Sequence, residues 1–174
     1  MPRAGRGGAL DALYDGAAGL AALFMLGLLV MVMLSILGRQ LHFHLPGVDA
    51  YAGYMMAAAG FLALAHTLKK GEHIRVTLIL GSLKGKARRA LEIWSLAAAS
   101  LLALLFAFYG CRLARQSYTL HDISTGSDAT PLWIPQLSMA VGTVVLAIAF
   151  IDELVLELRG QRAAGTAGEA ARNE

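Results

Sequence analysis

Four long apolar runs alternate with short polar segments along the chain. The runs are 16–38, 50–68, 93–111 and 129–151. A charged residue stands immediately before and after each of them. A bilayer core about 30 Å thick needs roughly 20 helical residues to cross it. The pattern therefore predicts an all-α membrane protein with four transmembrane helices in one membrane domain, 16–158.

The first run has an alternative interpretation as a cleaved signal peptide, because Arg3 and Arg6 precede it. The apolar region of a signal peptide is only about 7–15 residues long. The run 16–38 is longer, and Arg39 follows it directly. We therefore expect an uncleaved first span, preceded by a short cytoplasmic segment, 1–15.

The distribution of basic residues predicts the orientation. The segment 69–89 holds seven of the fifteen Lys and Arg residues and a single acid, Glu72. Four spans place this segment on the same side as both termini, which gives that side twelve basic residues and leaves three on the other. Because Lys and Arg accumulate in cytoplasmic loops, the chain is expected to be N-in and C-in.

The middle of this basic segment is apolar but too short to span. Residues 74–83 predict a short amphipathic helix that lies in the cytoplasmic interface between the second and third spans. Each flanking basic residue near an anionic leaflet contributes about 1 kcal/mol of attraction, so lipid head groups are expected partners of 69–89. The end of the chain, 159–174, is rich in Ala, Gly and charge, which predicts a disordered cytoplasmic tail.

Composition supports the membrane class. The chain is 57% hydrophobic and 16% charged, whereas soluble domains carry about 25% charged residues. The net charge of +3 does not indicate nucleic-acid binding, because the basic residues lie beside membrane-length runs. One cysteine, Cys111, excludes an internal disulfide and supplies no metal motif.

Small residues recur at helical spacing in three of the runs. In lipid, such residues allow helices to approach closely. We expect these faces mainly to pack inside the bundle, while a surface for a partner protein stays open as the alternative. The sets are Gly53, Ala57, Gly60 and Ala63; Ala99, Ala103 and Ala107; and Ser138 with Gly142.

The centres of all four runs lack Asp, Glu, Lys and Arg. A transporter that works alone normally places ionisable residues near the midplane. No catalytic constellation or phosphate loop occurs, so we expect no enzyme activity, no cofactor and no metal. His42 and His44 could contact a metal ion, but they have no nearby Cys or clustered acid, so we expect an ordinary loop there. The chain is therefore expected to lack catalytic or ion-coupling machinery of its own. One alternative is a redox or quinone-linked anchor subunit, which would need paired His residues within its spans. Another is a stand-alone exporter, which would normally have an acidic residue in the first span, where this chain has none.

Several short motifs stand at the span boundaries and in the basic segment. They are Gly38-Arg39, Pro46 with Asp49, His73-Ile74-Arg75-Val76, Arg88-Arg89 and Trp133-Ile134-Pro135. In this ordered set the chain resembles the small permease subunit of tripartite ATP-independent periplasmic (TRAP) transporters, the DctQ family, over 17–158. The family often has an acid where Arg75 stands.

The resemblance implies a scaffold subunit in a bacterial inner membrane. Such subunits pair with a large permease subunit that carries the substrate and sodium sites. A periplasmic solute-binding protein delivers a carboxylate-bearing solute, often a dicarboxylate, keto acid or sialic acid. Docking of that binding protein is a further role that the resemblance suggests.

Several boundary residues are candidates for structural or partner contacts. Arg39 and Asp49 are candidates for an ion pair across the turn between the first two spans, and two separately solvated boundary charges are the alternative. His73 and Arg75 are candidates for contact with the large subunit or lipid head groups, with general basic anchoring as the alternative. The charged residues of the outer loop are candidates for docking the binding protein, with ordinary loop solvation as the favoured alternative. The full set is Arg39, Asp49, His73, Arg75, Arg88, Arg89, Arg112, Arg115 and Trp133, with Asp122 and Asp128 in the outer loop.

Overall fold

The computed structural model describes residues 8–43, 45–69, 86–126 and 128–159. These residues form four α-helices and no β-strand, apart from an isolated antiparallel bridge between Ile123 and Pro131. All four helices are long and apolar enough to cross a membrane. The predicted all-α, four-span class is confirmed. The expected interfacial helix at 74–83 and the tail from 160 lie outside the described residues. The helices are α1 (Gly8–Gln40), α2 (Val48–Lys69), α4 (Lys86–Leu120) and α5 (Trp133–Leu158).

Two of the helices are much longer than the apolar runs within them. α1 has 33 residues and α4 has 35. At 1.5 Å per residue each is about 50 Å long, so the charged ends extend past a bilayer core of about 30 Å. α5 begins only at Trp133. The residues before it, 129–132, belong to a loop in which Ala129 has a positive φ of 46°.

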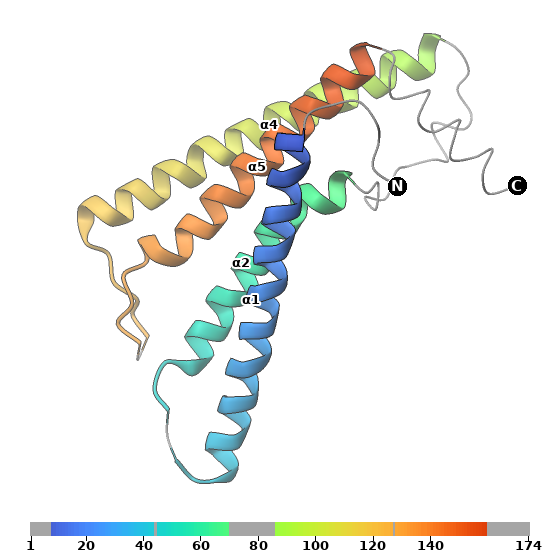
Figure 1. Cartoon of the computed structure of the whole chain (residues 1–174). Coiled ribbons are helices and arrows are strands. Elements are labelled where there is room, and N and C mark those ends of the chain that lie inside the picture. Colours follow the sequence, from blue (N-terminus) through green and yellow to red (C-terminus); the bar gives the residue numbers. More distant parts are fainter. Residues whose placement is uncertain (1–7, 44, 70–85, 127, 160–174) are drawn as a thin grey trace, which may run out of the picture.

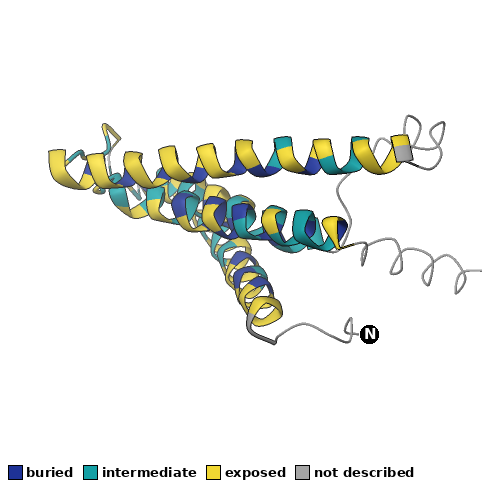
Figure 2. Ribbon diagram, turned by 90° about the horizontal axis from the view of Figure 1, so that it is seen from above, coloured by how far each residue is buried: buried dark blue, intermediate teal, exposed yellow. Residues whose placement is uncertain are grey.

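The helices form two hairpins, α1–α2 and α4–α5, which are joined through contact between α2 and α5 (Figure 1). α1 packs mainly on α2, and α4 packs mainly on α5. The hairpins cross steeply and diverge away from their contact, as Figures 1 and 2 agree. We call the end where α1 and α4 begin and α2 and α5 end the terminal end. The opposite end, with the turn 41–47 and the loop 121–132, is the loop end.

α4 packs on α5 through a seam of mostly small side chains. Buried positions recur every three or four residues along α4, on the side that faces α5 (Figure 2). Small side chains let two helices approach closely, which is the main source of helix association in lipid. The Ala103 and Ala107 face therefore packs inside the chain, as expected. The seam consists of Leu96, Ser100, Ala103, Ala107, Gly110, Ala114 and Ser117.

α2 and α5 approach each other closely at Gly142. A Cβ atom at this position would lie 2.6 Å from the backbone C and O of Phe61. Only glycine therefore allows the observed contact. Gly142 was expected to pack inside the bundle, and it does so.

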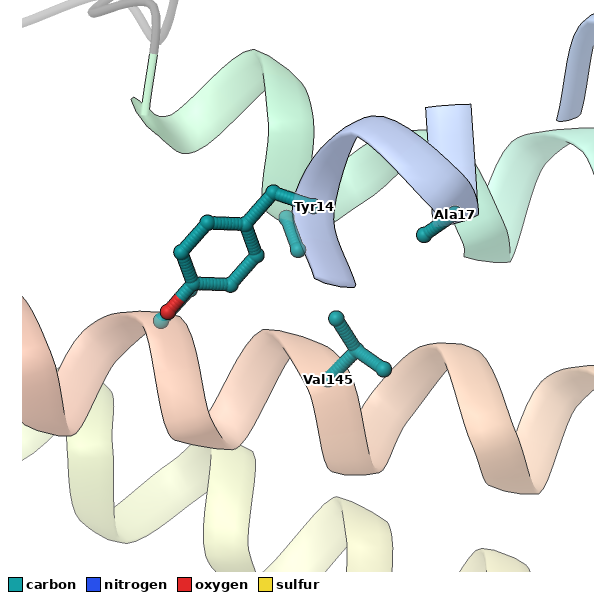
Figure 3. Close-up of a cluster of buried hydrophobic side chains, with 5 residues drawn as sticks. Tyr14, Ala17 and Val145 are labelled. Carbon is teal, nitrogen blue, oxygen red and sulfur yellow. The ribbon is translucent and has the colours of Figure 1, made fainter. Parts of the chain in front are cut away.

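The buried centre of the molecule lies where α1, α2 and α5 meet. Tyr14 and Ala17 of α1 contact Ala65 of α2 and Val145 and Ala149 of α5 (Figure 3). The alanines bring the three backbones close together, and the Tyr14 ring covers the junction toward the terminal end. This cluster brings α1 into the contact between the two hairpins, because α1 otherwise has little contact with α5.

The small-residue face of α2 is not covered by any other described residue of the chain. Gly53, Ala57 and Gly60 are exposed. No atom lies within 4 Å of a Cβ added at Gly53 or Gly60. The expectation of internal packing is therefore wrong for these three residues, because α1 and α5 occupy the other sides of α2.

Candidate functional site

A cluster of charged side chains joins α2 to α5 at the terminal end. Lys69, the last residue of α2, forms an ion pair with Asp152, and its Nζ lies 3.3 Å from Glu153 Oε1. The Lys69 side chain is 17% exposed, and that of Glu153 is 5% exposed. A cation at a helix C-terminus is favoured by the helix dipole. Its partners come from the point where the apolar run of α5 ends.

Two contacts from α1 complete this cluster. Lys69 Nζ lies 5.3 Å from the centroid of the Tyr14 ring, a cation–π geometry. The Tyr14 hydroxyl is buried and has no hydrogen-bond partner in the described residues. His66 Nδ1 lies 3.6 Å from Asp15 Oδ1. The cluster therefore ties three helices together where their apolar surfaces end.

Sequence reasoning identified Lys69 only as a cation that ends a span. It missed the ion pair because a run of hydropathy does not show which side of a helix faces a neighbour. One signal was available: Asp152 and Glu153 end the fourth run on the side of the membrane where Lys69 ends the second.

At the loop end, the loop 121–132 contacts the start of α2. The Tyr54 hydroxyl donates to Asp128 Oδ2 at 3.0 Å, and Thr130 Oγ1 donates to the Tyr51 hydroxyl at 3.1 Å. A Cβ added to Gly47, whose φ is +84°, would lie 2.9 Å from Asp128 Cβ. Glycine at this position allows both the left-handed backbone and the close approach of the loop.

The Asp128 carboxylate is the main acceptor in this contact. Ser124 Oγ donates to its Oδ1 at 2.8 Å, in addition to the bond from Tyr54. The neighbouring Thr130 hydroxyl, followed by those of Ser124 and Tyr54, lowers the pKa of Asp128 from 3.8 to about 2. Hydrogen bonds to a carboxylate favour its ionised form. The contact is therefore complete at neutral pH.

We predict that the loop contact weakens only in strong acid. The folded pKa of Asp128 lies below its ordinary value of 3.8, which applies in the unfolded chain. Its contribution to stability is thus full above about pH 4 and is lost as the pH falls toward 2. A carbon NMR titration of the Asp128 carboxyl in micelles should give a midpoint near 2. Tyr54→Phe should raise that midpoint, and an unchanged midpoint in this variant would contradict the assigned hydrogen bond.

The candidate pair between Arg39 and Asp49 does not occur among the ion pairs of the described residues. Asp49 Oδ1 instead accepts a hydrogen bond from Ser35 Oγ at 2.8 Å. Ser35 lies one helical turn before Arg39 on α1, within hydrogen-bond distance of the Asp49 side chain. The turn between α1 and α2 is therefore fixed by a neutral donor, and Arg39 stays exposed.

The two arginines at the start of α4 have different contacts. Arg88 Nε lies 3.1 Å from Glu92 Oε1, an exposed pair one turn apart on the same helix. Arg89 Nη2 donates to the Leu158 carbonyl at 3.2 Å, which joins the start of α4 to the end of α5. His73 and Arg75 lie outside the described residues.

The outer candidates do not form one site. Arg112 and Arg115 are exposed on α4, and neither has an ion pair within the described part of the chain. Asp128 is engaged with α2, as described above. Trp133 packs edge-to-face on Tyr118, with ring centroids 5.6 Å apart. This contact holds the end of α4 next to the start of α5, where the loop 121–132 connects them.

The described residues contain no group of His, Cys, Asp or Glu that could hold a metal ion. Their charged residues lie near the helix ends, and the polar residues between them mostly bond their own backbone. Thr143 Oγ1, for example, donates to the Met139 carbonyl at 2.9 Å. The fold thus defines a multi-pass membrane protein in which charged side chains near the helix ends join neighbouring helices.

Comparison with protein families gives the particular class. The family model for tripartite ATP-independent periplasmic transporters, DctQ component, matches residues 28–160. The chain belongs to this family, as the sequence resemblance indicated. It is therefore the small component of a TRAP transporter, a system that also contains a large permease and a binding protein. A comparison with curated proteins finds no match.

Proposed function

We propose that the chain is the scaffold subunit of a sodium-coupled TRAP transporter that takes up carboxylate-bearing solutes across a bacterial inner membrane. The observation that carries this proposal is the family match over residues 28–160. The expected orientation places the terminal end in the cytoplasm, because most basic residues lie on that side. The chain itself is proposed to have no enzyme activity and no cofactor.

A scaffold role agrees with where the charges lie. Secondary transporters bind substrate and coupling ions near the membrane midplane, often at broken helices with ionisable residues. α5, in contrast, is continuous from Trp133 to Leu158, and its acids begin only at Asp152. The substrate and sodium sites are therefore assigned to the large permease subunit.

The exposed face of α2 is the proposed contact with the large subunit. Gly53, Ala57 and Gly60 form a small-residue face that no other described element covers. Small-residue faces are typical of contacts between transmembrane helices. The outward face of α4, in contrast, carries large apolar residues such as Leu101 and Phe108, which suit lipid. The exposed Arg112 and Arg115 at its loop-end half are proposed to help dock the binding protein.

The experiment that tests this function is copurification of the chain with the large subunit, combined with uptake driven by a sodium gradient. Gly60→Leu should remove most of the copurified large subunit and lower uptake in parallel, because a large side chain separates the helices. Gly19→Leu is the matched control, since Gly19 of α1 also has open space around it.

Two outcomes would count against the proposal. Full uptake by the large subunit and binding protein without this chain would exclude a required scaffold. Equal losses in Gly60→Leu and Gly19→Leu would show that the α2 face is not the contact.

A further inference from the structure

The two hairpins touch at three levels along α2. Near the middle of α2, Phe61 contacts Gly142 of α5. Toward the terminal end, Lys69 pairs with Asp152 and Glu153. Toward the loop end, α2 and α5 diverge, and the loop 121–132 crosses the widening space to reach the start of α2 (Figure 1).

We propose that the loop 121–132 is a strut that fixes the opening angle between the two hairpins. Its contacts are the hydrogen bonds Tyr54 to Asp128 and Thr130 to Tyr51, and the close approach of Gly47. The inference concerns the chain alone and does not depend on the proposed function.

The loop has internal hydrogen bonds that make its backbone rigid. The backbone N–H of Ser124 donates to the Thr130 carbonyl at 2.8 Å, and that of Leu132 donates to the Asp122 carbonyl at 2.9 Å. The Ser124 side chain bonds Asp128, the same residue that contacts α2. Trp133 of α5 packs on Tyr118 of α4, which holds together the two helix ends that bear the loop. The loop is thus attached at both ends and joined across its middle.

The strut closes a triangle. One side is the part of α2 from Phe61 back to Tyr54, about 10 Å at 1.5 Å per residue. A second side is the part of α5 from Gly142 back to Trp133, about 13 Å by the same rise. The loop is the third side, and three fixed sides determine one angle.

The contact at Gly142 would not determine this angle by itself. Gly142 has no side chain to interlock with α2, and the buried cluster of Tyr14, Ala65 and Val145 holds the hairpins together on the terminal side of this contact. The Lys69 cluster resists opening on that same side. The strut and the charged cluster therefore hold the two hairpins on opposite sides of the Gly142 contact, and the hairpins are expected to move as one rigid body.

The test measures the distance between the hairpins with paired spin labels in a Cys111→Ala background. Leu37 of α1 and Leu113 of α4 are exposed positions in the loop-end halves of the two hairpins. The double variant Tyr51→Phe/Tyr54→Phe removes both hydroxyls and keeps both rings. We expect the distance distribution to broaden and its mean to increase by several ångströms. A label pair within one hairpin, at Leu113 and Val141, should not change.

An unchanged Leu37–Leu113 distribution in the double variant would overturn the strut. Equal broadening of the Leu113–Val141 pair would overturn it as well, because that result indicates general loosening. Thr130→Val removes one hydrogen bond from the other side of the contact. It should give a smaller increase in the same direction, and no increase would contradict the proposal.

Discussion

Replacing Lys69 by methionine is expected to destabilise the chain by about 2 kcal/mol, between the values for an exposed and a buried ion pair, because the side chains of Lys69 and Asp152 are partly buried. The substitution keeps the length and the apolar stem of the side chain but removes the ammonium group. Asp152 then loses its ion-pair partner, although its side chain is only 21% exposed. The cation–π contact with Tyr14 is lost at the same time. Reversible unfolding in mixed micelles measures the free-energy change.

Arg88→Met is the matched control for this prediction. It also removes one cation from an ion pair, but the Arg88 side chain is 56% exposed and pairs with Glu92 on the same helix. Exposed pairs contribute about 0–1 kcal/mol, so the loss should be small. Lys69→Arg should retain most of the stability, since it keeps the charge. Similar losses in Lys69→Met and Arg88→Met would refute a special role for the terminal-end cluster.

Gly142→Ala is expected to separate α2 from α5. The added Cβ would lie 2.6 Å from backbone atoms of Phe61, and backbone atoms cannot move aside as the end of a flexible side chain can. Overpacking of this kind costs about 1–3 kcal/mol and occasionally more. Gly142→Leu should prevent the helix contact entirely. Unfolding in micelles gives the stability, and the Leu37–Leu113 label pair reports the separation.

Gly53→Ala provides the comparison. Gly53 also lies within a helix, but a Cβ there meets no atom within 4 Å. Alanine has the higher helix propensity by about 1 kcal/mol, so this variant should be neutral or slightly more stable. If Gly142→Ala were as harmless as Gly53→Ala, the close approach at Phe61 would be wrong.

Sequence patterns located the spans better than the contacts. The runs predicted four helices, and charged residues marked where each run ends. The small-residue pattern predicted helix packing, yet it could not distinguish Ala103, which is buried against α5, from Gly53, which is exposed. Both positions belong to the same type of pattern, and only the placement of neighbouring helices separates them.

The boundary charges show the same limit. Arg39 and Asp49 flank one turn, so a pair between them was a reasonable prediction. Instead Ser35, one helical turn earlier, bonds Asp49. The most extensive charged contact in the described residues joins Lys69 to Asp152, 83 positions apart. The sequence places both residues at span ends on the same side of the membrane, but it does not show which side of each helix faces the other.

For this protein, the sequence alone determined the membrane class, the four spans and the family resemblance. Those features depend on hydropathy and on residues that mark span ends, both of which are local. The tertiary structure decided how the hairpins meet: the Gly142 contact, the Lys69 cluster and the loop from Asp128 to Tyr54. The physical reason is that lipid tails solvate every apolar helix surface about equally well, so hydropathy does not select which helices pack together. The choice of neighbour therefore depends on close backbone approach and on a few polar side chains whose partners lie far away in the sequence.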